Sequence, residues 1–189
     1  MVLSKFPDTY SRTMIYLRIL LLFTTITTMT ETLVSQYSKL ASCANPEFDR
    51  KVNSYLEYTA PVISVTDAYN DRDKILFVDA RGFGEYKVSH IPAARFVDYN
   101  KFDLDMLKDI PKNKRIVVYC SIGYRSEKIA TKMIKAGFTN VSNLYGSIFE
   151  WANAGHDLYD LQGKPTKNIH TYNKKWGKWV NNPEYNKLW

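Results

Sequence analysis

The sequence predicts an α/β domain with a central, mainly parallel five-stranded sheet and helices on both faces. Short apolar runs alternate along the chain with a segment of helical periodicity, which is the pattern of strands joined by helical crossovers. The run at 74–79 is nearly all apolar, as expected for a strand that is covered on both faces. The predicted strands are 61–65, 74–79, 95–97, 115–119 and 140–144.

Helical spacing is clearest between the last two predicted strands. Apolar residues in 126–136 fall on one face of a helix, and Gly137 is well placed to end it. A shorter helical turn is expected at 67–69, with Thr66 as its N-cap.

The composition is that of an ordinary globular protein and excludes several kinds of site. The chain has 189 residues, 45% hydrophobic and 24% charged, which suffices for one domain with extensions. Its net charge of +7 favours anionic partners without identifying nucleic acid. Because Cys43 and Cys120 are the only cysteines, a disulfide framework and a cysteine-rich metal site are excluded, and the three histidines show no zinc spacing.

Residues 1–43 carry features of a targeting segment. A short apolar run at 19–26 follows the basic residues Lys5, Arg12 and Arg18, which is the order found in a secretory signal. The run is too short and too rich in threonine for a spanning helix, which needs about 20 apolar residues. We therefore expect a signal or an anchor in this part of the chain.

The segment that ends at Cys43 resembles a bacterial lipobox, in which the cysteine becomes the lipidated first residue of the mature protein. It has the sequence LASC at 40–43, although Glu31 and Lys39 separate it from the apolar run. We rank a lipoprotein signal first, a cleaved signal or an uncleaved anchor second, and a buried helix last. The first two predict an exported protein, periplasmic or membrane-anchored outside the cytoplasm. The alternative is a cytoplasmic protein in which Cys43 is a free thiol.

The rest of the chain divides into three parts. Residues 44–60 are mixed and polar and predict a linker, and residues 61–160 hold all five predicted strands. Residues 161–189 form a tail of six lysines and one acid, with a net charge of +5, interleaved with three tryptophans and two tyrosines. Such a tail could bind nucleic acid or an anionic surface. We prefer the alternative in which its rings pack on the domain and its lysines stay solvated.

The most informative segment is the loop at 120–126, with the sequence CSIGYRS. Cys120 falls at the carboxyl end of the strand at 115–119, where ligands bind in parallel sheets. The following helix N-terminus and Arg125 would both lower the pKa of a thiol. Gly123 permits a left-handed backbone angle, so the loop's N–H groups can face inward and bind an anion. An inert core thiol is the alternative, but the combination of glycine, arginine and helix favours a nucleophile.

Further motifs precede and follow this loop within residues 61–155. Upstream are Val78-Asp79-Ala80-Arg81, Glu85-Tyr86 and His90-Ile91-Pro92-Ala93-Ala94, and downstream are Gly137-Phe138, Val141, Leu144-Tyr145-Gly146 and Trp151. In this order they resemble a single rhodanese (sulfurtransferase) domain. The departures are mild, and none touches the loop. Ser89 and Ala93 replace common glycines, and Gly146-Ser147 replaces a glycine pair.

The resemblance implies a rhodanese-like fold and a sulfurtransferase that needs no metal and no cofactor. Cys120 would take the outer sulfur of thiosulfate, or of a persulfide donor, and pass it to a thiophilic acceptor such as cyanide, a thiol or a partner protein. Arg125 would orient the anionic donor and offset charge on the adduct. The loop that binds the persulfide would comprise Ser121, Ile122, Gly123, Tyr124 and Ser126.

Asp79, Arg81 and His90 are predicted to be structural residues near the site. The resemblance implies that the first two form an ion pair that fixes loops, and that the histidine braces a loop. A general base is unnecessary if Cys120 is already ionised.

Three other functions stay open at this point. Phosphatases and arsenate reductases of this fold place one residue more between cysteine and arginine than the four found here, so this chemistry is disfavoured. A non-catalytic binding module and a dedicated sulfur carrier are the other two. The expected partners are a small sulfur-containing anion and a thiol or protein acceptor. Nucleic acid is not expected, and a membrane is a possible partner only through the N-terminus.

Overall fold

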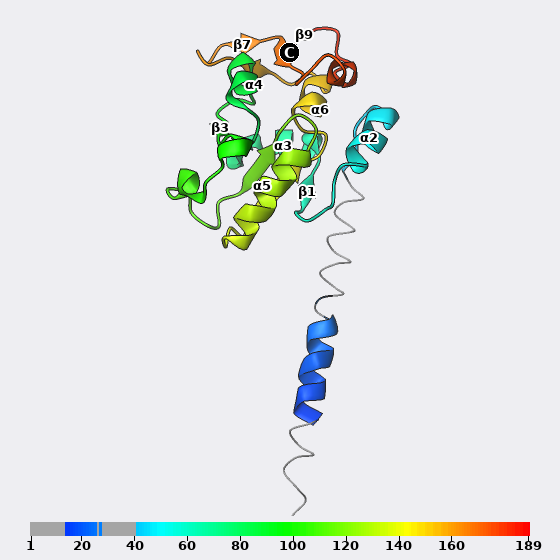
Figure 1. The fold of residues 1–189 in the computed structure, drawn as a ribbon, viewed down its shortest axis with the longest axis vertical. Helices are drawn as coiled ribbons and strands as arrows, with labels where there is room; N and C mark the ends of the chain where they lie inside the picture. The colour runs from blue at the N-terminus through cyan, green and yellow to red at the C-terminus, as the bar shows by residue number, and fades with distance from the viewer. Residues whose placement is uncertain (1–13, 26, 28–40) are drawn as a thin grey trace, which may run out of the picture. The chain divides into compact units, whose positions relative to one another are not determined.

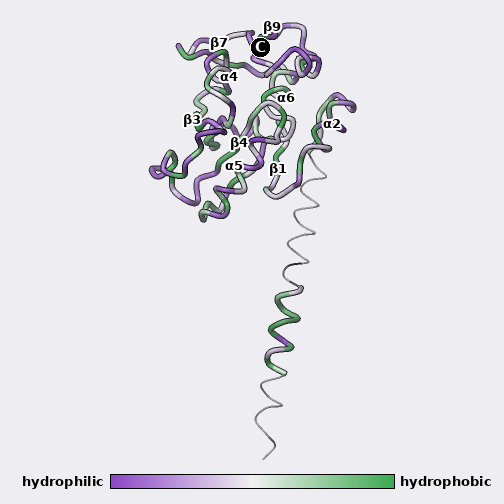
Figure 2. The backbone as a smooth tube through the Cα atoms, in the orientation of Figure 1, coloured by the Kyte–Doolittle hydropathy of each residue, from purple (hydrophilic) through white to green (hydrophobic). Residues whose placement is uncertain are grey.

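The computed structural model describes residues 14–25, 27 and 41–189, in two compact units, residues 1–36 and 37–189 (Figure 1). In the first unit, residues 14–25 form a helix with exposed side chains, and Figure 2 colours most of it as hydrophobic. Within the described residues, no helix combines the length and the apolarity that crossing a membrane requires. The basic residues Lys5 and Arg12 of the predicted signal lie outside the described residues, as does Leu40 of the lipobox-like segment.

The second unit is built on a five-stranded parallel sheet in the order β1-β5-β4-β2-β3. Each of the five predicted strands is present and slightly shorter than predicted, so the predicted sheet is confirmed. β4 is the central strand of this sheet, and its four residues are all buried, as its apolar sequence predicts. The strands are β1 (Val62–Ile63), β2 (Leu76–Asp79), β3 (Arg95–Phe96), β4 (Ile116–Tyr119) and β5 (Val141–Leu144).

Alternate residues of the central strands enter two separate cores. Phe77 and Val117 belong to one hydrophobic cluster, while Val78 and Val118 belong to the other. This alternation follows from the two-residue period of a strand. The first cluster receives buried residues from α2 (Pro46–Asn53), α3 (Val65–Asn70) and α6 (Ser147–Asn153). The second receives them mainly from α5 (Tyr124–Lys135). Helices therefore cover both faces (Figure 1).

Helix α5 follows its predicted pattern closely. Ile129, Ala130 and Met133 are fully buried against the sheet. The helix ends one residue before the predicted limit, and Gly137 adopts φ +88° just beyond it. The N–H of Phe138 then donates to the carbonyl of Met133 at 3.1 Å, which satisfies one of the last free carbonyls of the helix.

Two local predictions differ from the structure. The N-cap of α3 is Ser64 rather than Thr66, because the helix begins two residues earlier than predicted, and the Ser64 hydroxyl accepts the N–H of Asp67 at 3.0 Å. Residues 44–60 do not form a simple linker, because 46–53 are the helix α2. Asn45 caps this helix, and the fully buried Phe48 places its apolar side in the first core.

The basic tail is folded onto the same unit. Ile169 and Val180 are fully buried, and the Trp179 ring stacks on Phe48 at 5.6 Å between ring centroids. Several rings therefore pack on the domain, while Tyr172 and Trp189 stay exposed. The remaining short elements are α4 (Phe83–Val88), β6 (Leu158–Tyr159), β7 (Pro165–Thr166), β8 (Asn168–His170), β9 (Asn186–Leu188) and the 3-10 turns Arg72–Lys74, Tyr99–Lys101, Leu104–Leu107 and Trp176–Trp179.

Candidate active site around Cys120

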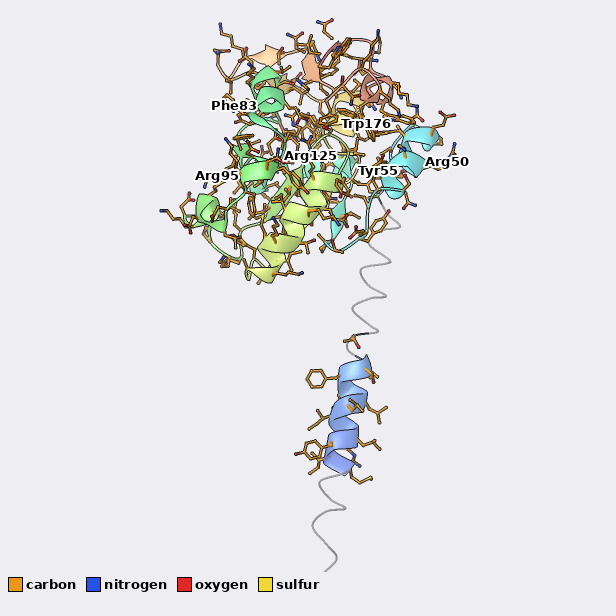
Figure 3. All side chains as sticks on the ribbon, viewed as in Figure 1. Arg50, Tyr55, Phe83, Arg95, Arg125 and Trp176 are labelled. Carbon is orange, nitrogen blue, oxygen red and sulfur yellow. The ribbon has the colours of Figure 1, made fainter. Side chains whose placement is uncertain are left out.

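Cys120 lies at the carboxyl end of β4 and lines a pocket of about 340 Å³. The residue is almost fully buried, with 1% of its surface exposed, and it contributes to the lining of this pocket. Figure 3 labels Arg125, Tyr55 and Trp176, three of the residues that surround the pocket. The lining residues are Tyr55, Tyr99, Asn100, Cys120, Ser121, Ile122, Tyr124, Arg125, Tyr172 and Trp176.

The loop surrounds the thiol with positive charge and hydrogen-bond donors. Burial alone would raise the pKa of Cys120. The charge of Arg125, the Ser126 hydroxyl and the backbone N–H groups of Ser126 and Gly123 outweigh burial and bring the pKa below its ordinary value. The N–H of Gly123 donates to Cys120 Sγ at 3.2 Å. The site therefore favours a thiolate.

Gly123 allows the loop to fold over the sulfur. Its φ of +122° is a conformation that side chains rarely adopt. A Cβ atom at this position would also lie 3.3 Å from Leu56 Cδ2 and 3.5 Å from Asn143 Nδ2. The predicted left-handed backbone angle at this glycine is confirmed, and the crowding gives a second reason for glycine at this position.

Arg125 is held by a carboxylate that is distant in the sequence. Its Nη1 and Nη2 atoms donate to the two carboxylate oxygens of Glu85 at 2.7 and 2.8 Å, and Nη2 also donates to Ser121 Oγ at 3.0 Å. The Ser121 hydroxyl in turn donates to Glu85 Oε1 at 3.1 Å. The guanidinium is thus fixed beside the thiol, but much of its charge is neutralised.

Glu85 is a site residue that sequence reasoning missed. It lies in α4, where its carboxylate also accepts the N–H of Gly82 at 3.1 Å. Burial would raise the pKa of Glu85, but Arg125 and then Arg81 hold the pKa below its ordinary value, so the group is a carboxylate. The Glu85-Tyr86 motif was visible in the sequence, but no local signal joins it to an arginine forty positions away.

Two further buried residues support the loop from the neighbouring strand and helix. Asn143 Nδ2 in β5 donates to the carbonyl of Gly123 at 3.0 Å, and its Oδ1 lies 2.6 Å from Ser126 Oγ. The backbone N–H of Cys120 donates to Ser147 Oγ at 2.9 Å. Ser147, which stands where the resemblance implies a glycine, adopts a left-handed φ of +54°. Sequence reasoning missed both supports.

Asp79, Arg81 and His90 do not line the pocket. Arg81 and Asp79 form a fully buried pair, with Nη2 to Oδ2 at 2.7 Å, and Arg81 also donates to the carbonyl of Ser89 at 2.6 Å. His90 stacks on the Tyr86 ring at 4.1 Å between centroids. Burial lowers the pKa of this histidine. These contacts fit a role in holding loops.

The outer wall of the pocket is aromatic. Two residues of the loop, Ile122 and Tyr124, line the pocket, and Tyr124 is 40% exposed. Tyr55, Tyr172 and Trp176 come from segments that sequence reasoning assigned to a linker and a tail. The alternation of lysines and aromatic residues in the tail was visible in the sequence, but the sequence did not indicate that these rings would line the pocket.

Cys43, the predicted lipidation residue, lies in the first hydrophobic core and is 7% exposed. Burial, followed by the carboxylates of Glu150 and Asp49, raises the pKa of Cys43 far above its ordinary value. Its backbone N–H donates to Asp49 Oδ1 at 2.8 Å. In this structure the thiol is therefore protonated and covered. Among the described residues, no group of three or more histidine, cysteine or carboxylate side chains could hold a metal ion.

Comparison with known proteins agrees with the site geometry. A family model described as a rhodanese-like domain matches residues 64–154. A tRNA uridine(34) hydroxylase from Pectobacterium atrosepticum is 37% identical over 109 residues, which are 54% of this chain and 29% of that protein. The homologous hydroxylase of Erwinia tasmaniensis is 36% identical over 107 residues. The chain thus spans less than a third of these relatives' length.

Solved structures show the same fold. The BH2092 protein of Bacillus halodurans superposes with a TM-score of 0.51 at 28% identity, over 63% of this chain and 89% of that one. A thiosulfate sulfurtransferase from Pseudomonas aeruginosa gives a TM-score of 0.50 at 22% identity, over 66% of this chain and 24% of that one. With the family match and the parallel sheet, these likenesses show that residues 64–154 of this chain form a rhodanese-like domain.

Proposed function

We propose that the chain is a sulfurtransferase that carries sulfur as a persulfide on Cys120. The observation that carries the proposal is the state of the thiol, which lies at the base of a pocket, accepts an N–H from Gly123 and has a lowered pKa. A thiolate at a protected but accessible position is what a sulfur-carrying nucleophile needs.

The reaction takes place in two balanced steps. The Cys120 thiolate attacks the outer sulfur of thiosulfate, the bond between the two sulfur atoms of the donor breaks, and sulfite leaves with the electron pair. In the second step an acceptor nucleophile attacks the outer sulfur of the persulfide, and Cys120 leaves as a thiolate. With cyanide as acceptor the product is thiocyanate. Neither step requires an external oxidant or a general base.

The loop stabilises the charged intermediate. A persulfide anion extends the sulfur chain by one atom from Cys120 Sγ, which already receives the N–H groups of Gly123 and Ser126. The positive φ of Gly123 and the N-terminus of α5, which begins at Tyr124, supply donors and a partial positive charge there. Arg125 adds a fixed cation, tempered by Glu85.

Intact-mass measurement tests the proposal directly. The purified full chain is incubated with thiosulfate or, separately, with methanethiosulfonate. We expect a gain of one sulfur atom, removed by cyanide and absent in Cys120→Ser. If neither donor forms the adduct while Cys120 is reduced and reacts with iodoacetamide, the chain is not a sulfurtransferase. A Cys120→Ser variant that keeps the biological role would instead support a binding module.

Assays on the same purified chain distinguish two alternative functions from this chemistry. Hydrolysis of aryl phosphates without sulfur loading would support a phosphatase, which the four residues between Cys120 and Arg125 disfavour. Sulfur loading from one dedicated protein, with no loading from small donors, would support a dedicated sulfur carrier.

A tRNA substrate is a second candidate function, favoured by the relatives' name and by the positively charged tail. Most of those relatives' length has no counterpart in the match, so their activity does not transfer with the domain. Binding of tRNA that weakens steeply with salt, and that is lost when tail lysines are replaced by glutamine, would support it. Binding that is unaffected by these replacements would contradict it.

Export through residues 1–43 also stays a proposal, because most of this segment lies outside the described residues. Lipidation would require Cys43 to leave its buried position beside Glu150. Mass spectrometry of the mature N-terminus tests the lipoprotein signal: a chain that begins at a lipidated Cys43 supports it, and an intact Met1 with an unmodified Cys43 contradicts it.

A further inference from the structure

The pocket over Cys120 is larger and more apolar than a small inorganic dianion requires. Its volume of about 340 Å³ falls within the range of about 300–1,000 Å³ that is typical of pockets for organic ligands. Five aromatic side chains line it, and they belong to segments well separated in sequence: Tyr55, Tyr99, Tyr124, Tyr172 and Trp176.

Three of these rings form a continuous row. Tyr55 meets Tyr124 edge to face at 6.2 Å between centroids and meets Trp176 in the same way at 5.6 Å. Lys51 Nζ lies 4.8 Å from the Tyr55 centroid and 6.0 Å from that of Trp176, which holds this pair from a third side. The row is thus pre-formed, and a planar group can pack on it without first ordering it.

Tyr172 is placed over the site by its own backbone. It adopts φ +65°, a conformation that is uncommon outside glycine, and its N–H donates to His170 Nδ1 at 3.0 Å. The Arg125 guanidinium carbon lies 5.6 Å from the Tyr172 centroid. The ring is 58% exposed, so burial of the ring does not account for its position.

The charge at the pocket wall does not favour a dianion. Among the described residues that line the pocket, Arg125 is the only one with a charged side chain. Both of its terminal nitrogens already donate to Glu85. Next to the single negative charge of a Cys120 thiolate, a dianion would find no unpaired cation among these lining residues, and Lys51 Nζ lies over the Tyr55 ring without being one of them.

We propose that Tyr55, Tyr172 and Trp176 select a sulfur donor with a planar aromatic body over thiosulfate and over aliphatic donors. The proposal rests on the sulfurtransferase function, whose donor it specifies. Tyr55 precedes the rhodanese-like domain at 64–154, and Tyr172 and Trp176 follow it. The rhodanese-like domain therefore supplies the nucleophile, and the flanking segments supply the selectivity.

Benzenethiosulfonate and methanethiosulfonate form a matched pair of donors for the test. Both are monoanions, and both react in the same way: the Cys120 thiolate takes the outer sulfur, the donor's sulfur–sulfur bond breaks, and a sulfinate leaves with the electron pair. The rate of sulfur loading on the full chain is followed by intact mass. Each rate is divided by that donor's rate with free glutathione, which removes the intrinsic reactivity of the donor.

We expect the wild type to favour the aromatic donor by about threefold to tenfold after this correction, which corresponds to about 0.7–1.4 kcal/mol for one added ring contact. Tyr172→Ala and Trp176→Ala should bring the ratio towards one. Trp189→Ala is the control, because this tail ring is 63% exposed and does not line the pocket. Trp176→Phe should restore most of the ratio.

The outcomes test the donor selectivity separately from the sulfurtransferase function. A wild-type ratio near one, or a ratio that Tyr172→Ala leaves unchanged, overturns the selectivity while sulfur loading continues. Absence of loading by both donors instead overturns the sulfurtransferase function. Because Tyr172 is exposed, its variant should fold even if Trp176→Ala does not, and unchanged thermal unfolding verifies this.

Discussion

The two cysteines of this protein are both buried, yet their surroundings shift their pKa values in opposite directions. Cys43 and Cys120 are 7% and 1% exposed, so desolvation acts against ionisation at each. Around Cys43 the nearest charges are the carboxylates of Glu150 and Asp49, which add to burial and raise the pKa further. Around Cys120, Arg125 and converging N–H groups overcome burial. The sign of the neighbouring charge, rather than burial, separates a core thiol from a nucleophile.

The two thiols occupy sites on either side of one dipeptide. A Cβ atom on Gly146 would lie 2.6 Å from Cys43 Sγ, while Ser147 Oγ accepts the N–H of Cys120 at 2.9 Å. Two consecutive residues at the start of α6 therefore lie against different cysteines: Gly146 lies close to the Cys43 sulfur, and Ser147 binds the backbone N–H of Cys120. Substitutions in this dipeptide and among the charged neighbours of each thiol test the difference between the environments of Cys43 and Cys120.

The largest expected effect is the loss of sulfur loading on replacing one thiol but not the other. Cys120→Ser should show no persulfide by intact mass after thiosulfonate treatment, because serine cannot take the sulfane sulfur. Cys43→Ser, the matched control, should load as the wild type does. Loading that survives in Cys120→Ser and disappears in Cys43→Ser would reverse the assignment of the two residues.

A crowded glycine should be the next most sensitive position. In Gly146→Ala the new methyl group would meet Cys43 Sγ at 2.6 Å and Glu150 Cβ at 2.7 Å. Gly137→Ala is the control, since it also has a positive φ but nothing within 4 Å. We expect the first variant to lose about 1–3 kcal/mol more of the free energy of unfolding than the second, measured by urea denaturation. Equal losses would mean that backbone conformation alone sets the cost.

Removal of Arg125 should make Cys120 behave more like an ordinary thiol. The thiolate fraction grows as pH rises, so a lowered pKa moves the rise in alkylation rate below the ordinary thiol value of about 8.5. In Arg125→Ala this rise should move to higher pH, and at a pH below both pKa values the iodoacetamide rate should fall about tenfold for each unit by which the pKa increases.

The control for this experiment is Arg95→Ala, which removes an arginine that is paired with Asp109 and does not line the pocket. Its alkylation profile should match that of the wild type. If Arg125→Ala also leaves the profile in place, the Ser126 hydroxyl and the N–H groups of the loop set the pKa of Cys120 without Arg125.

The smallest effect is expected on the inert side. Glu150→Gln removes a negative charge beside Cys43 but keeps a carbonyl oxygen that can accept the N–H of Ala44, which Glu150 accepts at 2.8 Å. The pKa of Cys43 should fall and still stay above its ordinary value, because burial is the larger cause. Thiolate absorbance during a pH titration in the Cys120→Ser background measures it. An unchanged titration would show that Glu150 does not contribute, and that burial and Asp49 set the pKa of Cys43.

Local patterns in the sequence predicted the scaffold well. The five strands, the helix after Cys120 and the glycines at 123 and 137 follow from apolar period and backbone freedom, which are properties of adjacent residues. The prediction of a linker at 44–60 was wrong, because 46–53 form a short polar helix whose two buried residues, Phe48 and Val52, lie four positions apart and so on one face.

The sheet and the loop around Cys120 could be predicted from the sequence alone, because strand, loop and helix are continuous in the chain. Only the tertiary structure decided what the loop faces. The Glu85 that partly neutralises Arg125, the Asn143 beneath Gly123, and the ring wall of Tyr55 and Trp176 all come from segments brought in by packing. Such contacts depend on the three-dimensional arrangement of elements, which hydrophobic period and residue spacing do not encode.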